Sequence, residues 1–160
     1  MSKIAPCLWF NGEAEEAAKF YVSQLPDSRI DKIQRNPVDG PAGKAGSVLV
    51  VLFTLAGQEF MALNGGQPME YTHAISLKID CADQAEVDRL WEGLSSNGGS
   101  TLQCGWLKDR YGVFWQITPS VMLSKLLGGP DPAGSKRAMQ AMMQMTKLDI
   151  VVLQKAYDGG

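Results

Sequence analysis

Residues 4–21 read IAPCLWFNGEAEEAAKFY, and this stretch decides the fold of the first half of the chain. The apolar run from Ile4 to Phe10 predicts a short strand. After Gly12, small and aromatic side chains recur at the i, i+3, i+4, i+7 spacing of one buried helical stripe, namely Ala14, Ala17, Ala18 and Tyr21. Pro26 ends this helix. The stretch therefore predicts a strand followed by a helix that packs one face on a core.

Three further strands are expected in the first half, over residues 28–35, 48–55 and 59–63. A loop rich in Pro and Gly, residues 36–46, separates the first two. Residues 48–55 are apolar at both parities, which predicts a strand covered on both faces.

The second half repeats this order. Ile75, Leu77 and Ile79 alternate with polar residues, as in a half-buried strand. Asp83 followed by Glu86 resembles a capping box, and the helix behind it carries an apolar stripe of Val87, Leu90, Trp91 and Leu94. Short strands are expected over 101–104, 106–108 and 113–118. Strand–helix–strand–strand–strand thus occurs twice, with a period near 70 residues, which predicts a duplicated α+β unit.

A third segment is helical. Helices are expected over 120–127, from Pro132 with Asp131 as N-cap, and from Asp149 to Gly159. Met139, Met142, Met143 and Thr146 share one stripe, which favours ordinary core over a pocket lid or a partner surface. We expect one domain, residues 1–160, with modules at about 1–68 and 69–119 and a helical segment at about 120–160.

Composition bears on the binding partners and on the cellular location of the protein. The chain has 160 residues and net charge −2 without a basic stripe, which argues against nucleic acid. Its longest apolar run is far shorter than the ~20 residues of a membrane span, and residues 1–6 lack a signal-peptide core. Cys7, Cys81 and Cys104 form no CxxC pair, and their odd number favours reduced thiols in a cytoplasmic protein.

Four segments resemble the PhnB-like branch of the vicinal-oxygen-chelate superfamily, the glyoxalase and bleomycin-resistance proteins, often labelled 3-demethylubiquinone 3-methyltransferase. They are residues 6–21, 62–66, 74–81 and 103–116. The resemblance implies tandem βαβββ modules that form curled mixed sheets around a cavity, and a homodimer.

Enzymes of that superfamily bind one divalent metal through residues of the first and fourth strands of each module. The matching positions here are Ile4, Ala5 or Pro6, the segment 61–64, Ala74, and Gln116, where relatives carry Glu. Only Asn64 and Gln116 offer oxygen, as neutral amides, which are poor ligands for transition metals. We expect no metal and no cofactor.

Methyl transfer is not supported by the residues. A doubly wound enzyme that uses S-adenosylmethionine needs a glycine-rich turn from a strand into a helix. Gly65-Gly66 and Gly98-Gly99 lack that context, because the second pair ends a helix.

The expected ligand site is aromatic and neutral-polar, because amides stand where relatives carry carboxylates. Its candidate residues are Cys7, Trp9, Asn64, Cys104, Trp106, Phe114 and Gln116. The alternative is that these side chains only fill the sheet interior. Cys104 is either a nucleophile or a small buried apolar residue, and His73 either a general base or a histidine at a strand entrance.

No catalytic residue is assigned, and whether the protein is an enzyme stays open. The favoured function is binding of a small organic molecule in a metal-free cavity. The alternatives are a metal-dependent lyase or dioxygenase of the glyoxalase kind, and a protein that sequesters a drug or other ligand without turnover.

Overall fold

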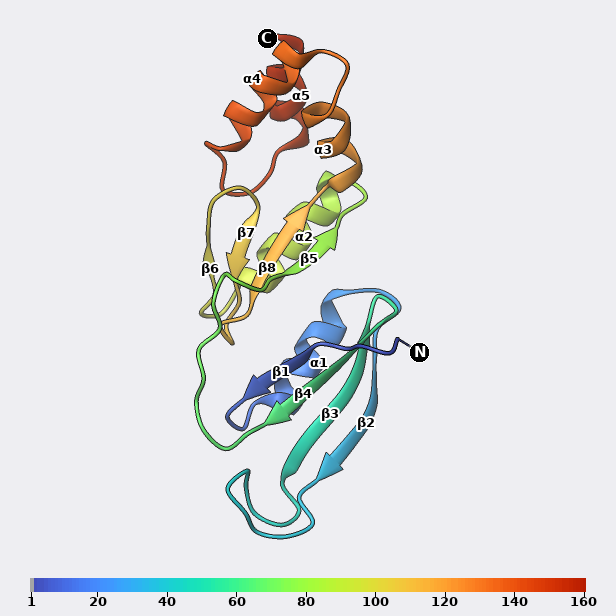
Figure 1. Cartoon of the computed structure of the whole chain (residues 1–160), viewed down its shortest axis with the longest axis vertical. Coiled ribbons are helices and arrows are strands. Elements are labelled where there is room, and N and C mark those ends of the chain that lie inside the picture. The colour runs from blue at the N-terminus through green and yellow to red at the C-terminus, as the bar shows by residue number, and fades with distance from the viewer. Residues whose placement is uncertain (1) are drawn as a thin grey trace. The chain divides into compact units, whose positions relative to one another are not determined.

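The computed structural model describes residues 2–160 and divides into two compact units, one ending at Glu70 and the other running from Tyr71 to Gly160. Each unit contains a strand–helix–strand–strand–strand series, and three helices follow the second (Figure 1). The α+β class with two βαβββ modules and C-terminal helices is therefore confirmed. That the sheets curl around a cavity stays a prediction.

In the first unit, helix α1 lies against a four-stranded mixed sheet in the order β1-β4-β3-β2. β1 runs parallel to β4, and the other pairs are antiparallel. The elements are β1 (Cys7–Phe10), α1 (Ala14–Gln24), β2 (Arg29–Arg35), β3 (Val48–Leu55) and β4 (Gln58–Asn64).

The core of the first unit lies between α1 and one face of this sheet. The helical stripe expected from the sequence is buried as a whole, and Tyr21 stacks on Phe53 of β3 with ring centroids 6.5 Å apart. The register places Leu8, Ala62 and Val51 in one row of this face. The opposite face, here the first open face, carries side chains that are exposed or half-buried: Cys7, Trp9, Val50, Leu52, Met61 and Leu63. The expectation that both faces of residues 48–55 are covered is therefore wrong at Val50 and Leu52.

The second unit repeats the arrangement with β5 (Leu77–Asp80), α2 (Gln84–Ser95), β6 (Ser100–Thr101), β7 (Trp106–Lys108) and β8 (Phe114–Thr118). Its sheet has the order β5-β8-β7-β6, with β5 parallel to β8. Leu107, Trp115 and Ile117 are buried on the face that α2 covers, together with its stripe residues Val87, Leu90 and Leu94.

Two expectations in this unit are wrong. β5 begins at Leu77, and Ile75 lies outside it with 78% of its surface exposed. The strand expected over 101–104 ends at Thr101, because Cys104 has a left-handed φ of 58° and turns the chain towards Gly105.

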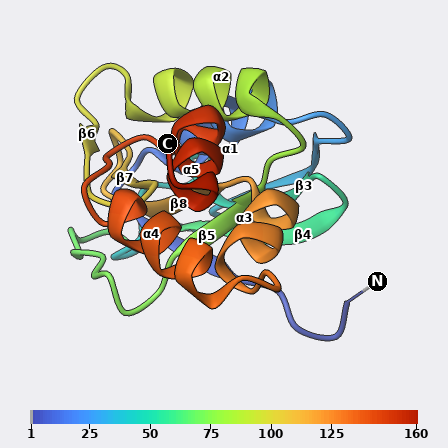
Figure 2. The ribbon, with the colours of Figure 1, turned by 90° about the horizontal axis from the view of Figure 1, so that it is seen from above.

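The C-terminal segment forms α3 (Ser120–Leu127), α4 (Pro132–Met142) and α5 (Ile150–Asp158), which gather around one another (Figures 1 and 2). Asp131 and Asp149 cap α4 and α5 as expected, each accepting a backbone N–H of its helix. The cluster at their centre consists of Leu126, Ala138 and Leu153.

The methionine stripe expected to be core is only partly buried, because Met142 packs against this cluster and the other two methionines do not. Met139 and Met143 are 39% and 52% exposed. Helix α4 instead buries Gly134 and Ala138, and a Cβ on Gly134 would lie 2.9 Å from the carbonyl oxygen of Tyr157. Small residues allow this close helix approach, and Met139 and Met143 therefore remain exposed.

Main-chain hydrogen bonds attach this helical segment to the second sheet. The N–H of Cys104 donates to the carbonyl of Met145 at 2.9 Å, and the N–H of Gly105 donates to that of Thr146 at 2.7 Å. Leu148 is buried against Gly105. Between residues 2 and 160, no helix has the length and apolar character needed to cross a membrane.

Candidate functional site

Three of the expected site residues meet on one face of the second sheet. Trp106 and Gln116 are direct partners across β7 and β8, and Phe114 lies two positions before Gln116 on the same strand. Because alternate residues of a strand share a face, all three lie on the side turned away from α2, here called the second open face. Trp106 and Gln116 are half-buried and Phe114 is buried.

His73 covers part of this aromatic surface. Its ring centroid lies 4.0 Å from that of Phe114 and 6.3 Å from that of Trp106. The Nζ of Lys108 lies 5.9 Å from the centroid of Phe114. Strand parity assigns His73 to the other face, but the residue precedes β5 in a turn, where alternation does not apply.

The polar group at the centre of the second open face is the Gln116 amide. Its Nε2 donates to Oγ of Ser76 at 2.8 Å. The carbonyl Oε1 of Gln116 stays available as an acceptor, and the Ser76 hydroxyl can still donate its own hydrogen. Sequence reasoning missed Ser76, although its position directly before β5 and its alternation with Leu77 indicate the same face.

Cys7 and Trp9 lie together on the first open face, as expected from their shared parity. The indole Nε1 of Trp9 donates to the carbonyl of Gln67 at 2.8 Å. This bond holds the ring so close to Gly65 that a Cβ there would lie 1.8 Å from it. Partial burial of the sulfur raises the pKa of the Cys7 thiol, which keeps it protonated near neutral pH.

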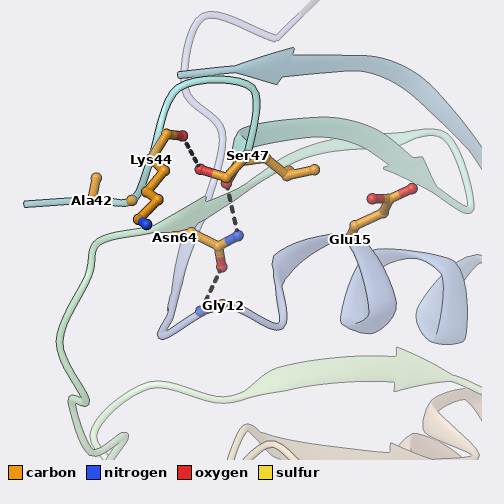
Figure 3. Close-up of a pocket in the computed structure, with 8 residues that line it drawn as sticks. Gly12, Glu15, Ala42, Lys44, Ser47 and Asn64 are labelled. Carbon is orange, nitrogen blue, oxygen red and sulfur yellow. Dashed lines mark hydrogen bonds between the residues drawn. The ribbon is translucent and has the colours of Figure 1, made fainter. Parts of the chain in front are cut away.

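Asn64 lies on the α1 side of the first sheet and works as a structural clamp. Its Oδ1 accepts the N–H groups of Gly12 and Ala14, each at 3.0 Å, and its Nδ2 donates to the carbonyl of Val48 at 3.0 Å. The buried amide thus caps α1 from a distant strand and ties it to β3 (Figure 3).

A pocket of about 400 Å³ lies beside Asn64, under the loop that joins β2 to β3. Its polar lining includes Glu15, Lys44 and Ser47 (Figure 3). Glu15 pairs with Lys19 at 2.7 Å, and the Ser47 hydroxyl donates to the carbonyl of Lys44. The hydrogen bond from Lys19 lowers the pKa of the Glu15 carboxyl.

A second pocket of about 330 Å³ touches the first open face at Leu52 and Met61. Two of its charged lining residues pair with each other, because Nε of Arg29 lies 2.7 Å from a carboxylate oxygen of Asp31. Oδ2 of Asp31 also accepts the hydroxyl of Thr54 at 2.6 Å.

Cys104 does not join the aromatic residues of the second open face. Its backbone N–H bonds to Met145, and its Sγ lies 3.6 Å from the carbonyl oxygen of Met142. The thiol therefore lies where the helical segment meets the sheet.

The donor set does not fit a resident divalent metal. On the first open face, β1 and β4 present Cys7, Met61 and Leu63 near the implied positions. On the second, Gln116 is neutral and bonded to Ser76, where zinc or manganese would require charge-balancing carboxylates or thiolates, or imidazoles. Within residues 2–160, no three His, Cys, Asp or Glu side chains form a group that could hold a metal ion.

The family model described as 3-demethylubiquinone-9 3-methyltransferase matches residues 2–118. The chain belongs to this family. The similar Bacillus cereus structure is described as a PhnB protein, so the PhnB-like resemblance inferred from the sequence is confirmed.

Solved structures of similar proteins agree. A Bacillus cereus protein described as a putative 3-demethylubiquinone-9 3-methyltransferase, PhnB protein, is 38% identical, with a TM-score of 0.64 over 72% of this chain and 97% of its own. Protein PA1353 from Pseudomonas aeruginosa is 23% identical, with a TM-score of 0.59 over 72% of this chain and 95% of its own, and shows a shared fold. No functionally curated protein matches significantly.

The family match ends just before the C-terminal helices. Its last residue is Thr118, and α3 begins at Ser120. Every site residue discussed above lies within the matched part, whereas the α3–α5 segment is an addition to it.

Proposed function

We propose that this PhnB-like protein binds a small organic molecule on the second open face, without a resident metal. The observation that supports this best is the convergence of Trp106, Phe114 and Gln116, with the His73 ring stacked on Phe114. Small-molecule sites are mostly aromatic and apolar, with a few polar groups that fix orientation. An aromatic ring favours a flat ligand, and the Gln116 carbonyl and Ser76 hydroxyl can accept and donate one hydrogen bond each.

Metal independence is part of the proposal, and the chemistry of the donor groups supports it. Gln116 cannot balance a dication, and the Asp80 carboxylate on the same face accepts the N–H of Ser120 at the start of α3. Metal-dependent lyase or dioxygenase chemistry is the alternative. Titration of the purified protein with Zn²⁺ and Mn²⁺ should give no stoichiometric high-affinity binding, and such binding would overturn this part.

Methyl transfer, the activity in the family's name, has no support from the glycine geometry. Gly65-Gly66 follows β4 and leads into a loop, and Gly98-Gly99 follows α2. Neither pair opens a helix, as the dinucleotide-type site of doubly wound enzymes requires. We expect no heat signal when S-adenosylmethionine is added to the protein in a calorimeter.

A homodimer completes the proposal. The family resemblance favours it, and half-buried aliphatic residues on the first open face supply apolar surface for an interface. Light scattering after size exclusion should give twice the chain mass. A cytoplasmic location, favoured by the free thiols of Cys7, Cys81 and Cys104, belongs to the same proposal.

The binding site itself can be tested with a flat, uncharged probe, 2-naphthamide. Its addition should shift the NMR signals of the Trp106 indole N–H and the Gln116 side-chain amide. Replacing Phe114 by Leu should weaken binding about two- to tenfold, since aromatic pairs add ~0.5–1.5 kcal/mol beyond buried area. Phe20→Leu, on α1 of the first unit, is the matched control. Absence of binding at millimolar probe, or shifts confined to other residues, would refute the site.

Ligand found by mass spectrometry in protein purified under native conditions would then separate the two remaining classes. Turnover of that ligand indicates an enzyme. Stoichiometric binding without turnover indicates a sequestering protein.

A further inference from the structure

We infer that the ligand of the second open face carries a negative charge on its planar ring system. This rests on the proposed function and specifies its substrate class. Two lysines flank the aromatic residues, because Lys78 is the direct partner of Gln116 across β5 and β8, and Lys108 is the direct partner of Phe114 across β7 and β8. Direct partners point to the same face of a sheet.

Both ammonium groups are available to a ligand. Lys78 and Lys108 are exposed, and neither forms an ion pair with any residue in the range 2–160. Their strands lie on either side of β8, roughly 10 Å apart at two strand spacings. Each side chain is long enough to reach a molecule seated on Trp106 and on the exposed His73 ring that covers Phe114.

The hydrogen-bonding groups on this face also favour a negatively charged ligand, because more of them donate than accept. Lysine ammonium groups only donate, and the Ser76 hydroxyl, which accepts one hydrogen bond from Gln116, can also donate its own hydrogen. The Gln116 carbonyl is the acceptor at the centre of the group. A ligand that supplies acceptor oxygens therefore satisfies more of these groups than one that supplies donors.

The Asp80 carboxylate does not cancel this preference for a negatively charged ligand. Asp80 lies on the same face, two positions beyond Lys78, but its Oδ1 accepts the N–H of Ser120 at 3.0 Å. Its charge is thereby directed at the N-terminus of α3, where a negative charge is favourable. Two lysines beside two aromatic rings fit a flat molecule with one carboxylate or phenolate oxygen.

The test compares two probes of the same shape, 2-naphthoate and 2-naphthamide, by calorimetric titration at low ionic strength. We expect naphthoate to bind about three- to tenfold more tightly, as two exposed ion pairs allow. This preference should shrink as salt is added. Lys78→Gln and Lys108→Gln should each reduce this preference, and in the double variant the two probes should bind equally. Lys136→Gln, an exposed lysine of α4, should leave both affinities unchanged.

The outcomes separate this inference from the proposed function. If both probes bind equally, or naphthamide binds more tightly, the charge inference is wrong and the binding face stands. A preference for naphthoate that survives in the double variant also overturns the charge inference, because groups other than these two lysines would then bind the carboxylate. If neither probe binds, the proposed function fails and this inference fails with it.

Discussion

Asp109 offers the sharpest test of how the second open face is built, because its carboxylate is buried at 2% exposure between β7 and β8. Oδ1 accepts the backbone N–H groups of Tyr111 and Val113 at 2.8 and 3.0 Å, and Oδ2 accepts Nε1 of Trp115 at 2.8 Å. The turn that these bonds hold leads directly into Phe114. We therefore predict the effect of Asp109→Asn, which keeps the shape and removes one acceptor oxygen.

The magnitude follows from counting donors. The asparagine carbonyl can take the place of Oδ1, but its NH₂ group then faces the Trp115 indole N–H, and two buried donors oppose each other. Leaving a buried donor unsatisfied costs ~1–3 kcal/mol, so we expect Asp109→Asn to lower the free energy of unfolding by about 2–3 kcal/mol. In a Trp115→Phe background the opposing donor is gone, and the same change should cost about 1 kcal/mol less.

Urea denaturation followed by far-UV circular dichroism measures all four members of this cycle without relying on tryptophan fluorescence. Asp83→Asn is the control, since asparagine caps a helix as well as aspartate and should change stability by less than about 0.5 kcal/mol. A cost below about 0.5 kcal/mol for Asp109→Asn, or the same cost in both backgrounds, would refute the reasoning.

Three further predictions concern the first unit and the buried thiol. Asn64→Ala should destabilise the protein by about 2–3 kcal/mol in urea denaturation, because two N–H groups near the start of α1 lose their acceptor; a loss below 1 kcal/mol would contradict this. Gly65→Ala should displace the Trp9 ring and break its bond to Gln67, seen as a shifted indole N–H signal in NMR, and an unshifted signal would disprove the contact. Burial raises the pKa of Cys81 to about 12 from 9.0, so the unfolded thiol ionises first and stability should fall as pH rises from 9 towards 12. Subtracting a Cys81→Ala series measured at pH 8 and 10 isolates this loss, and a difference that does not change with pH would count against it.

The fold was predictable from the sequence where the helical spacing of apolar residues determines which side chains are buried. The stripe from Ala14 to Tyr21 is buried as expected, because a helix packed on a sheet must cover its apolar side. The methionine stripe of α4 follows the same period, but its members Met139 and Met143 are exposed, since Gly134 and Ala138 allow a closer approach of neighbouring helices. Composition alone does not show which of two faces a neighbour can approach.

The candidate site was predictable in its strands and less so in its loops. Trp106, Phe114 and Gln116 share a face because strand alternation is strict. His73 reaches the same face from a turn, where parity gives no guidance. Cys104 was expected within a strand, and its left-handed backbone removes it from the alternation altogether. Whether the expected residues bind a ligand remains a prediction.

Peptide groups form the seam between Cys104, Gly105 and the 145–146 turn, so substitutions at Met145 or Thr146 remove neither acceptor, whereas a Cβ on Gly105 would lie 3.0 Å from the Ile117 carbonyl oxygen. The 145–146 side of this attachment can thus tolerate mutational drift that would erase any recognisable motif there. A version of the protein truncated after Thr118 would instead leave two amide hydrogens facing water and uncover the surface that Leu148 shields. Shorter members of the family must hydrate or otherwise cover this corner, which makes it a natural point for gaining or losing an appendage during evolution.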